Sequence, residues 1–395
     1  MRNRMRGLWV TAIVGLASIS IYISMAAFVI APPTAFAGPI ASILTVGDFN
    51  QDGISDILAE RVSAPDAGLL WIILIDGATG ERLTSEFPLQ LQEGYEFMAV
   101  GNFDGNLEGQ SQIAARKTSG TPIGEVGMVR LWDLSDDASA PSGPLEGILT
   151  IAPDPIYSLI GIGDLDGNGV EDFVFVQDST GPNPGLVRVY LMNTSMQLMK
   201  IAHPLIVGLP TAPSAPPNLE VLGVADANGD GFADILLADR TNRYMRVFLI
   251  RDDATKGIEV VAQRFVFGLP ENDFEFLGFA LIDPGSRADL IFISNGAADQ
   301  GLLQVGLMSS GAEGIGSSFY PANLGVDFDY VGSGLFDSDT EADLVVQRNS
   351  GASDGQIEVL LLEIDQEDKV KGTTFPTLLD PADWEERTTG AVVFP

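Results

Sequence analysis

The sequence predicts an all-β protein, a β-propeller with about six four-stranded blades and seven as the alternative number. Three observations support this prediction. An acidic loop between two strands recurs six times, an apolar run rich in β-branched and aromatic residues follows each loop, and no long amphipathic helix pattern occurs. Four-stranded units in tandem are typical of propellers, because radial closure removes exposed sheet edges.

The acidic loop defines the repeat. It follows a strand that ends in Gly or Ala, and a short apolar strand comes after it. The loop is complete in three copies: DFNQDGISD at 48–56, DLDGNGVED at 164–172 and DANGDGFAD at 226–234. Weaker copies lie in the segments from Gly101, Ala280 and Gly334. We number the loops one to six by their closing residues, which lie 54 to 62 residues apart: Asp56, Gln112, Asp172, Asp234, Asp289 and Asp343.

The third strand of each unit is the apolar run after the loop, and a more variable fourth strand leads to the next unit. The runs begin at Leu69, Met128, Leu186, Tyr244, Leu302 and Ile357. A stack of β-sandwiches is the alternative, but the period is short for independent sandwiches.

The tail at 384–394 loosely resembles 95–103. We interpret it as a strand that latches the ring, the alternative being the stub of a seventh blade.

The composition excludes several classes of protein. The chain has 395 residues, 54 acidic and 21 basic side chains, a net charge of −33, one His and no Cys. Without Cys there is no disulfide framework and no zinc–thiolate site. The negative charge repels phosphate backbones, so we expect no nucleic-acid partner and a preference for cations.

Residues 1–37 have the pattern of an export signal. Arg2, Arg4 and Arg6 precede an apolar stretch from Gly7 to about Pro32, and a small-x-small sequence ends at Ala37. We therefore expect a secreted, periplasmic or cell-surface protein whose mature domain covers 38–395. The apolar stretch is also long enough to span a bilayer, so an uncleaved N-terminal anchor is the alternative.

The complete loops have the spacing of a calcium site. Oxygen-bearing side chains occupy positions 1, 3, 5 and 9, Gly at position 6 permits a sharp turn, and position 7 offers a carbonyl. Ca²⁺ takes six to eight such oxygens. A hairpin held by Asx turns without an ion is the alternative. We expect three or four ions, with loop six as a poorer site and loops two and five without ions. The candidate ligands are Asp48, Asn50, Asp52, Ile54 and Asp56 in loop one; Asp164, Asp166, Asn168, Val170 and Asp172 in loop three; Asp226, Asn228, Asp230, Phe232 and Asp234 in loop four; and Asp337, Asp339 and Asp343 in loop six.

The unit Gly-x-x-acidic loop-apolar strand resembles the FG-GAP/VCBS repeats of integrin alpha-chain propellers and bacterial surface proteins. The resemblance covers about residues 40 to 365 and depends on VGDFNQDGISDIL, IGDLDGNGVEDFV and VADANGDGFADIL. It implies a propeller with Ca²⁺ in these loops, often used for adhesion or ligand binding. The chain departs from the integrin pattern in its three eroded loops and in having six copies where the integrin ring has seven.

The face opposite the acidic loops is a candidate ligand surface. Arginines end the second strands and aromatic residues lie near the starts of the first strands, a combination that suits an anionic glycan or an acidic peptide. The alternative is that the arginines pair with neighbouring acids and the aromatics pack between blades. The candidate residues are Arg61, Arg116, Arg240, Arg348, Tyr95, Tyr157, Phe274 and Tyr330.

No catalytic residue stands out. GASDG at 351–355 matches a nucleophile motif but lies in a turn between strands, and the one histidine, His203, is upstream. We interpret the protein as an exported, calcium-binding β-propeller that acts as a binding or adhesion module for a glycan or protein ligand. A polysaccharide lyase or hydrolase on the same scaffold and a structural surface component are the alternatives.

Overall fold

The computed structural model divides the chain into two units, Met1–Gly38 and Pro39–Pro395. The first unit, with the expected export signal at 1–37, lies outside the described residues. In the second unit the structure describes residues 41–61, 69–76, 82–91, 94–105, 111–120, 125–132, 151, 153, 156–178, 180–183, 185–203, 219–239, 244–253, 257–267, 274–282, 287–309, 314–325, 327–337, 339–349, 356–364, 370–374 and 392–393. No helix in these ranges is long and apolar enough to cross a membrane.

The second unit is all-β and contains six small sheets, as the repeat predicts. Sheet one contains β1 (Ala41–Gly47), β2 (Asp56–Arg61), β3 (Leu69–Ile75), β4 (Arg82–Gln90) and β24 (Val392–Val393). Sheet two contains β5 (Tyr95–Gly101), β6 (Gln112–Lys117) and β7 (Val129–Trp132), and sheet three contains β8 (Tyr157–Gly163), β9 (Asp172–Gln177), β10 (Val187–Met192) and β11 (Leu198–Ala202). Sheet four contains β12 (Leu219–Ala225), β13 (Asp234–Asp239), β14 (Tyr244–Asp253) and β15 (Gly257–Phe267). Sheet five contains β16 (Phe274–Ala280), β17 (Asp289–Ser294), β18 (Leu303–Met308) and β19 (Ile315–Phe319), and sheet six contains β20 (Phe328–Gly334), β21 (Asp343–Arg348), β22 (Ile357–Ile364) and β23 (Val370–Thr374).

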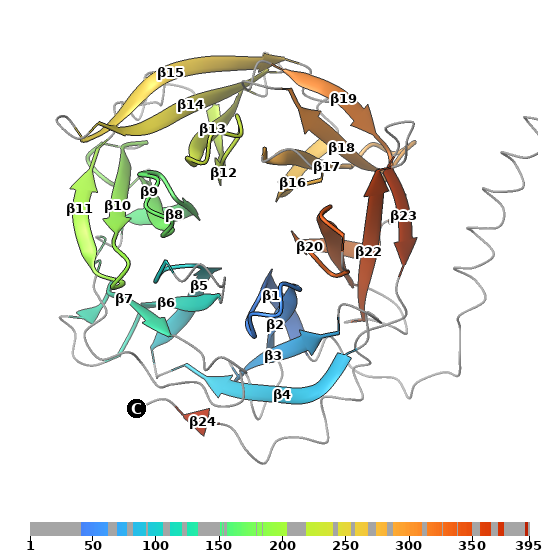
Figure 1. The fold of residues 1–395 in the computed structure, drawn as a ribbon, viewed down its shortest axis with the longest axis horizontal. Coiled ribbons are helices and arrows are strands. Elements are labelled where there is room, and N and C mark those ends of the chain that lie inside the picture. The colour runs from blue at the N-terminus through green and yellow to red at the C-terminus, as the bar shows by residue number, and fades with distance from the viewer. Residues whose placement is uncertain are drawn as a thin grey trace, which may run out of the picture. The chain divides into compact units, whose positions relative to one another are not determined.

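The sheets follow one another in a cyclic order. The first strand of each sheet lies innermost, and these strands contact each other in the series β1, β5, β8, β12, β16 and β20, with β20 returning to β1 (Figure 1). The tail strand β24 pairs in parallel with β4 and so extends sheet one. No seventh sheet occurs among the described residues.

Six apolar clusters fill the spaces between neighbouring sheets. In β2, for example, Leu58 packs toward sheet two, whereas Ile57 and Ala59 pack toward sheet six. The other clusters join sheets two and three, three and four, four and five, and five and six. Because both faces of each sheet are covered, the central residues of the second and third strands form mostly apolar runs and do not alternate between apolar and polar.

Every innermost strand has a register irregularity at the same place. The shift falls between the third and fifth residues of the strand, for example between Leu159 and Gly161 in β8. The equivalent shifts occur in β1, β5, β12, β16 and β20. A bulge bends a strand and increases its twist. The repeated bulge therefore gives the six innermost strands a common shape at the centre.

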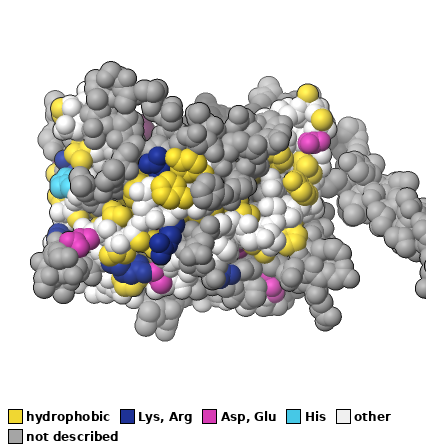
Figure 2. All heavy atoms as spheres, turned by 90° about the horizontal axis from the view of Figure 1, so that it is seen from above, with side chains coloured by type: hydrophobic (Ala, Val, Ile, Leu, Met, Phe, Trp, Pro, Cys, Tyr) yellow, Lys and Arg dark blue, Asp and Glu magenta, His cyan; other side chains and the backbone are white. Residues whose placement is uncertain are grey.

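The outer strands of two neighbouring sheets expose apolar side chains. Met199 and Ile201 on β11 and Val261 and Phe265 on β15 are between 44% and 55% exposed. Exposed basic residues accompany them on the same strands. Figure 2, which views the side of the sheets that carries β15, shows hydrophobic and basic side chains side by side there.

Candidate metal centre

The first Asp of each complete loop organises the loop backbone. In loop three, Oδ1 of Asp164 accepts hydrogen bonds from the amides of Gly167 (2.7 Å) and Asn168 (3.1 Å), and Oδ2 accepts one from Gly169 (2.8 Å). Asp48 and Asp226 accept amide hydrogen bonds from equivalent positions of loops one and four. The first carboxylate thus shapes each loop as an Asx-type turn, with or without an ion.

Where the closing residue of a loop is Asp, it fastens the loop to the third strand of its sheet. Asp172 is fully buried, and its two carboxylate oxygens accept the amides of Leu165 (3.0 Å) and Met192 (2.7 Å). The equivalent pairs of amides bind Asp56, Asp289 and Asp343 at 2.8–3.1 Å. In loop two, Gln112 Oε1 accepts the corresponding Phe103 amide. The closing carboxylate therefore has a structural role even in loop five, where no ion is expected.

A series of backbone hydrogen bonds links each loop to the next one around the ring. The amide just before each closing residue donates to the carbonyl at position 1 of the preceding loop. Ser55 donates to Leu335 and thereby joins loop one to loop six, across 280 residues of sequence, and the Leu335 amide donates in return to Ser55 Oγ. The other donor–acceptor pairs are Ser111–Asp48, Glu171–Asn102, Ala233–Asp164, Ala288–Asp226 and Ala342–Leu281. The loops thus form a closed belt at one end of the sheets.

Loop three has the donor set that a calcium ion requires. Carboxylate oxygens of Asp164, Asp166 and Asp172 lie within 4.8 Å of one another, and no other described group of three acidic side chains does so. Burial raises the pKa of Asp172 to about 8, although its two amide hydrogen bonds lower it in part. A cation beside this carboxylate would keep it ionised at neutral pH. Three hard oxygen donors on a preformed loop fit Ca²⁺.

Loop one has a similar backbone but a looser set of acids. Asn50 uses its side-chain amide to donate to Asp52 Oδ2 (3.0 Å), and Asp52 Oδ1 accepts the Ile54 amide. Burial raises the pKa of Asp48, and it raises that of Asp56 to about 8. The structure therefore brings the expected ligands of loop one onto one turn, but two of them, Asn50 and Asp52, are hydrogen-bonded to each other.

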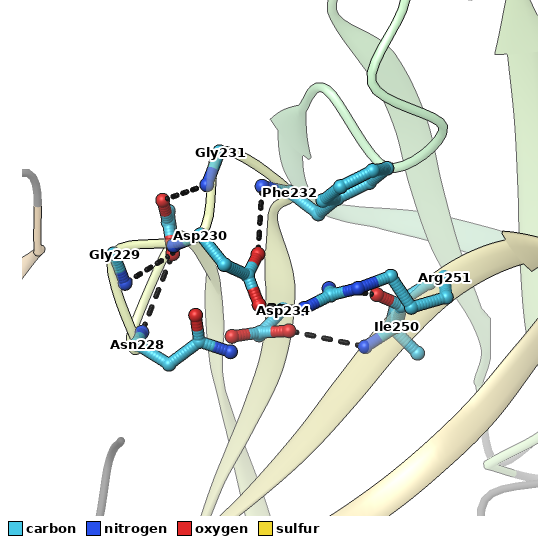
Figure 3. A network of polar contacts seen from close by, with 9 residues as sticks. Asn228, Gly229, Asp230, Gly231, Phe232, Asp234, Ile250 and Arg251 are labelled. Atoms are coloured by element: carbon cyan, nitrogen blue, oxygen red, sulfur yellow. Dashed lines mark hydrogen bonds and ion pairs between the residues drawn. The ribbon is translucent and has the colours of Figure 1, made fainter. Parts of the chain in front are cut away.

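Loop four differs because a basic side chain reaches it. Arg251 on β14 forms an ion pair with Asp230 and lies over the Phe232 ring, 4.4 Å from its centroid (Figure 3). Oδ1 of Asp234 accepts the Ile250 amide (3.0 Å), and burial raises the pKa of Asp234 to about 7. The sequence prediction missed Arg251. Its signal was its position, directly after the apolar run that begins at Tyr244.

Loop six is the poorer copy that the sequence predicts. Asp337 Oδ1 accepts the Asp339 amide (2.9 Å), and Asp339 Oδ1 accepts the Glu341 amide (3.0 Å). Burial, followed by the neighbouring Asp337, raises the pKa of Asp339 to about 6. Asp343 fastens this loop to β22. In the described part of loop six, these acids do not converge as those of loop three do.

Two of the four arginines proposed for the opposite face, Arg116 and Arg348, have partners within the described structure. Arg116 donates to the backbone carbonyls of Tyr157 (2.9 Å) and Pro153 (3.0 Å) and so connects sheets two and three. Arg348 lies 3.3 Å from Glu358 and over the Phe328 ring. The side chains of Arg61 and Arg240 lie outside the described part of the structure.

The aromatic residues proposed for that face pack inside the fold. Tyr95 and Tyr157 are buried at the starts of β5 and β8. Phe274, at the start of β16, and Tyr330, inside β20, pack against the apolar clusters between sheets. The structure therefore places these four side chains in the spaces between sheets.

A different set of polar side chains is exposed at that end. The second residue of several innermost strands is acidic, and three of these acids accept a hydrogen bond from a residue just after the second strand. The pairs are Glu96 with Thr118 (2.8 Å), Glu275 with Asn295 (2.9 Å) and Asp329 with Asn349 (2.8 Å). All six residues are exposed. Alignment of the repeats at YEF, FEF and FDY would have revealed the acids.

Comparison with known proteins does not assign a family. Scans against models of protein families and against curated proteins find no match. Among solved structures, an Agrocybe aegerita lectin described as recognising non-reducing terminal N-acetylglucosamine is 14% identical, with a TM-score of 0.47. The alignment covers 87% of this chain and 81% of the lectin chain. This likeness is too distant to assign a ligand.

Proposed function

We propose that the protein is an exported six-bladed β-propeller of the FG-GAP/VCBS type that binds a glycan. Its ligand surface would be the end of the sheets opposite the acidic loops. The observation that carries this proposal is the recurrence of three exposed acid–amide or acid–hydroxyl pairs at that end. Carboxylates accept hydrogen bonds from sugar hydroxyl groups, and Asn amides both donate and accept.

Calcium would have a structural role in this protein. Asp164, Asp166 and Asp172 would hold an ion at loop three, and the ion would offset the repulsion between their charges. At the millimolar Ca²⁺ concentration outside cells, even a weak site is filled, and a filled site stabilises the folded state. The belt of hydrogen bonds through the loops would then fix the six sheets relative to one another. The ligand face at the other end of the same sheets would be held in a fixed geometry as a result.

Glycan binding is tested with a glycan array, followed by calorimetry on any ligand found. The test variant combines Glu96→Gln, Glu275→Gln and Asp329→Asn, which keep the size of the side chains and remove their charge. Loss of binding by at least tenfold with an unchanged melting temperature supports the proposal. Equal binding by the variant and the wild type refutes this ligand face. Release of a shortened sugar product would favour an enzyme, and binding of proteins alone would favour a protein ligand.

Calcium binding is tested separately by thermal melts in EDTA and in Ca²⁺. At 100 times the dissociation constant, one site adds about 2.7 kcal/mol to the free energy of unfolding. Asp166→Asn is expected to remove most of the calcium-induced rise in melting temperature. Asp299→Asn, a change at an exposed turn residue of sheet five, serves as the control. An equal calcium response in Asp166→Asn and wild type contradicts a site at loop three.

A further inference from the structure

Arg251 lies beside loop four because of the way the closing Asp holds the third strand. Asp234 Oδ1 accepts the amide of Ile250 (3.0 Å), so the next residue of β14 stands next to the loop. In sheets one and three the equivalent amides belong to Ile75 and Met192, and the residues that follow are Asp76 and Asn193. Among the three complete loops, loop four is therefore the one in which this position carries a positive charge.

The guanidinium of Arg251 makes contacts that hold it at the loop. It pairs with Asp230 Oδ2, donates to the Ile250 carbonyl (2.6 Å) and lies over the Phe232 ring (Figure 3). The side chains of Arg251 and Asp230 are both 28% exposed, so the pair is partly shielded from solvent. On its other side, the Phe232 ring packs against Gly167 of loop three. The stack of Arg251 and Phe232 thus lies between the loop and its neighbour.

These contacts occupy both oxygens of Asp230, the acid at position 5 of the loop. Asp230 Oδ1 accepts the Phe232 amide (3.0 Å), and Oδ2 binds Arg251. Asp226 accepts amides on both of its oxygens, but so does Asp164 in loop three, so the difference between the two loops lies at Asp230. In addition, the acids of loop four do not converge in the described structure as those of loop three do.

We propose that Arg251 takes the place of calcium in loop four, so that this loop is closed without a metal while loop three binds one. The proposal differs from the sequence expectation, which placed an ion at Asp226, Asn228, Asp230, Phe232 and Asp234. It rests on the proposed function in one respect, the calcium ion at loop three. Closure of loop four would then not depend on external calcium, because the positive charge is part of the chain.

The test is the number of Ca²⁺ ions bound per chain, measured by elemental analysis of the purified protein after equilibration in calcium. Arg251→Gln removes the charge and frees the oxygen of Asp230, so this variant is expected to bind one more ion than the wild type. In EDTA it should melt at a lower temperature than the wild type. Calcium should raise its melting temperature back to that of the wild type. Arg251→Lys keeps the charge and is expected to bind the wild-type number.

Asp230→Asn decides the question if Arg251→Gln does not fold. Because Asp230 binds Arg251 and no ion in this proposal, Asp230→Asn is expected to leave the number of ions unchanged. The loss of one ion in Asp230→Asn, or an unchanged number in folded Arg251→Gln, overturns the proposal. Asp166→Asn tests the underlying assumption by itself, since it should lose one ion. If it does not, the calcium site at loop three fails, whatever the result at loop four.

Discussion

Asp289 offers the clearest test of the structural role of the closing carboxylates. Loop five is one of the loops in which no ion is expected, yet Asp289 is fully buried and accepts the amides of Ile282 (3.1 Å) and Met308 (2.8 Å). Asp289→Asn keeps the shape of the side chain but places an NH₂ group against one of these amides. One charge-assisted hydrogen bond is then lost, and a buried amide is left without its acceptor.

The expected loss follows from these contacts. A hydrogen bond to a charged group contributes about 1.5–3 kcal/mol, and an unsatisfied buried donor costs about 1–3 kcal/mol. Since these two effects overlap, we expect a loss of about 2–4 kcal/mol in the free energy of unfolding. For a domain of this size, the corresponding fall in melting temperature is roughly 3–5 °C.

The assay is a urea titration with a parallel thermal melt, each in EDTA and in Ca²⁺. The loss should be the same in both buffers, because no ion takes part. Asp299→Asn, at an exposed turn of the same sheet, is the control and should remain within about 0.5 kcal/mol of the wild type. A variant as stable as the wild type, or a loss that appears in calcium alone, refutes the reasoning.

Three further substitutions test other contacts in the fold. Gly167→Ala should destabilise the protein by at least about 1 kcal/mol more than Gly169→Ala, as measured by urea titration. Both glycines have positive φ (78° and 81°), so the backbone strain is similar. A Cβ at 167, however, would lie 2.6 Å from the Phe232 ring, whereas one at 169 would meet nothing within 4 Å. Equal losses of stability in the two variants would mean that the Phe232 ring does not pack against Gly167. Ser55→Ala removes the side-chain acceptor of the Leu335 amide (3.0 Å) where loop one meets loop six, so the free energy of unfolding should fall by about 1 kcal/mol; an unchanged value would mean that this junction is open in solution. Arg116→Ala removes two hydrogen bonds to the carbonyls of Tyr157 and Pro153 and should lower stability by about 2–3 kcal/mol without changing the affinity for a glycan. Weaker glycan binding in a variant of normal stability would return Arg116 to the ligand site.

The repeating architecture was readable from the chain because it depends on local patterns. The acidic loop and the apolar run recur in step, so the strands β1, β2 and β3 and their equivalents lie where the repeat predicts. The near-continuous apolar runs follow from sheets that are covered on both faces. The first and last residues of each loop were also recognisable, since Asp164 and Asp172 occupy fixed places relative to the strands.

The roles of individual charges were decided by tertiary structure. Loops one and three each carry three Asp, but among the described residues the three carboxylates converge only in loop three. Arg251 is 17 residues from Asp234, and only the pairing of β13 with β14 and the hydrogen bond to Ile250 bring it to the loop. Likewise, the partners of Arg116 lie 37 and 41 residues away, just before and at the start of the first strand of the next sheet. Sequence periodicity reports which strands form, because that depends on neighbouring residues. The partner of a buried charge depends on strand register and on contacts between sheets, which a single repeat does not contain.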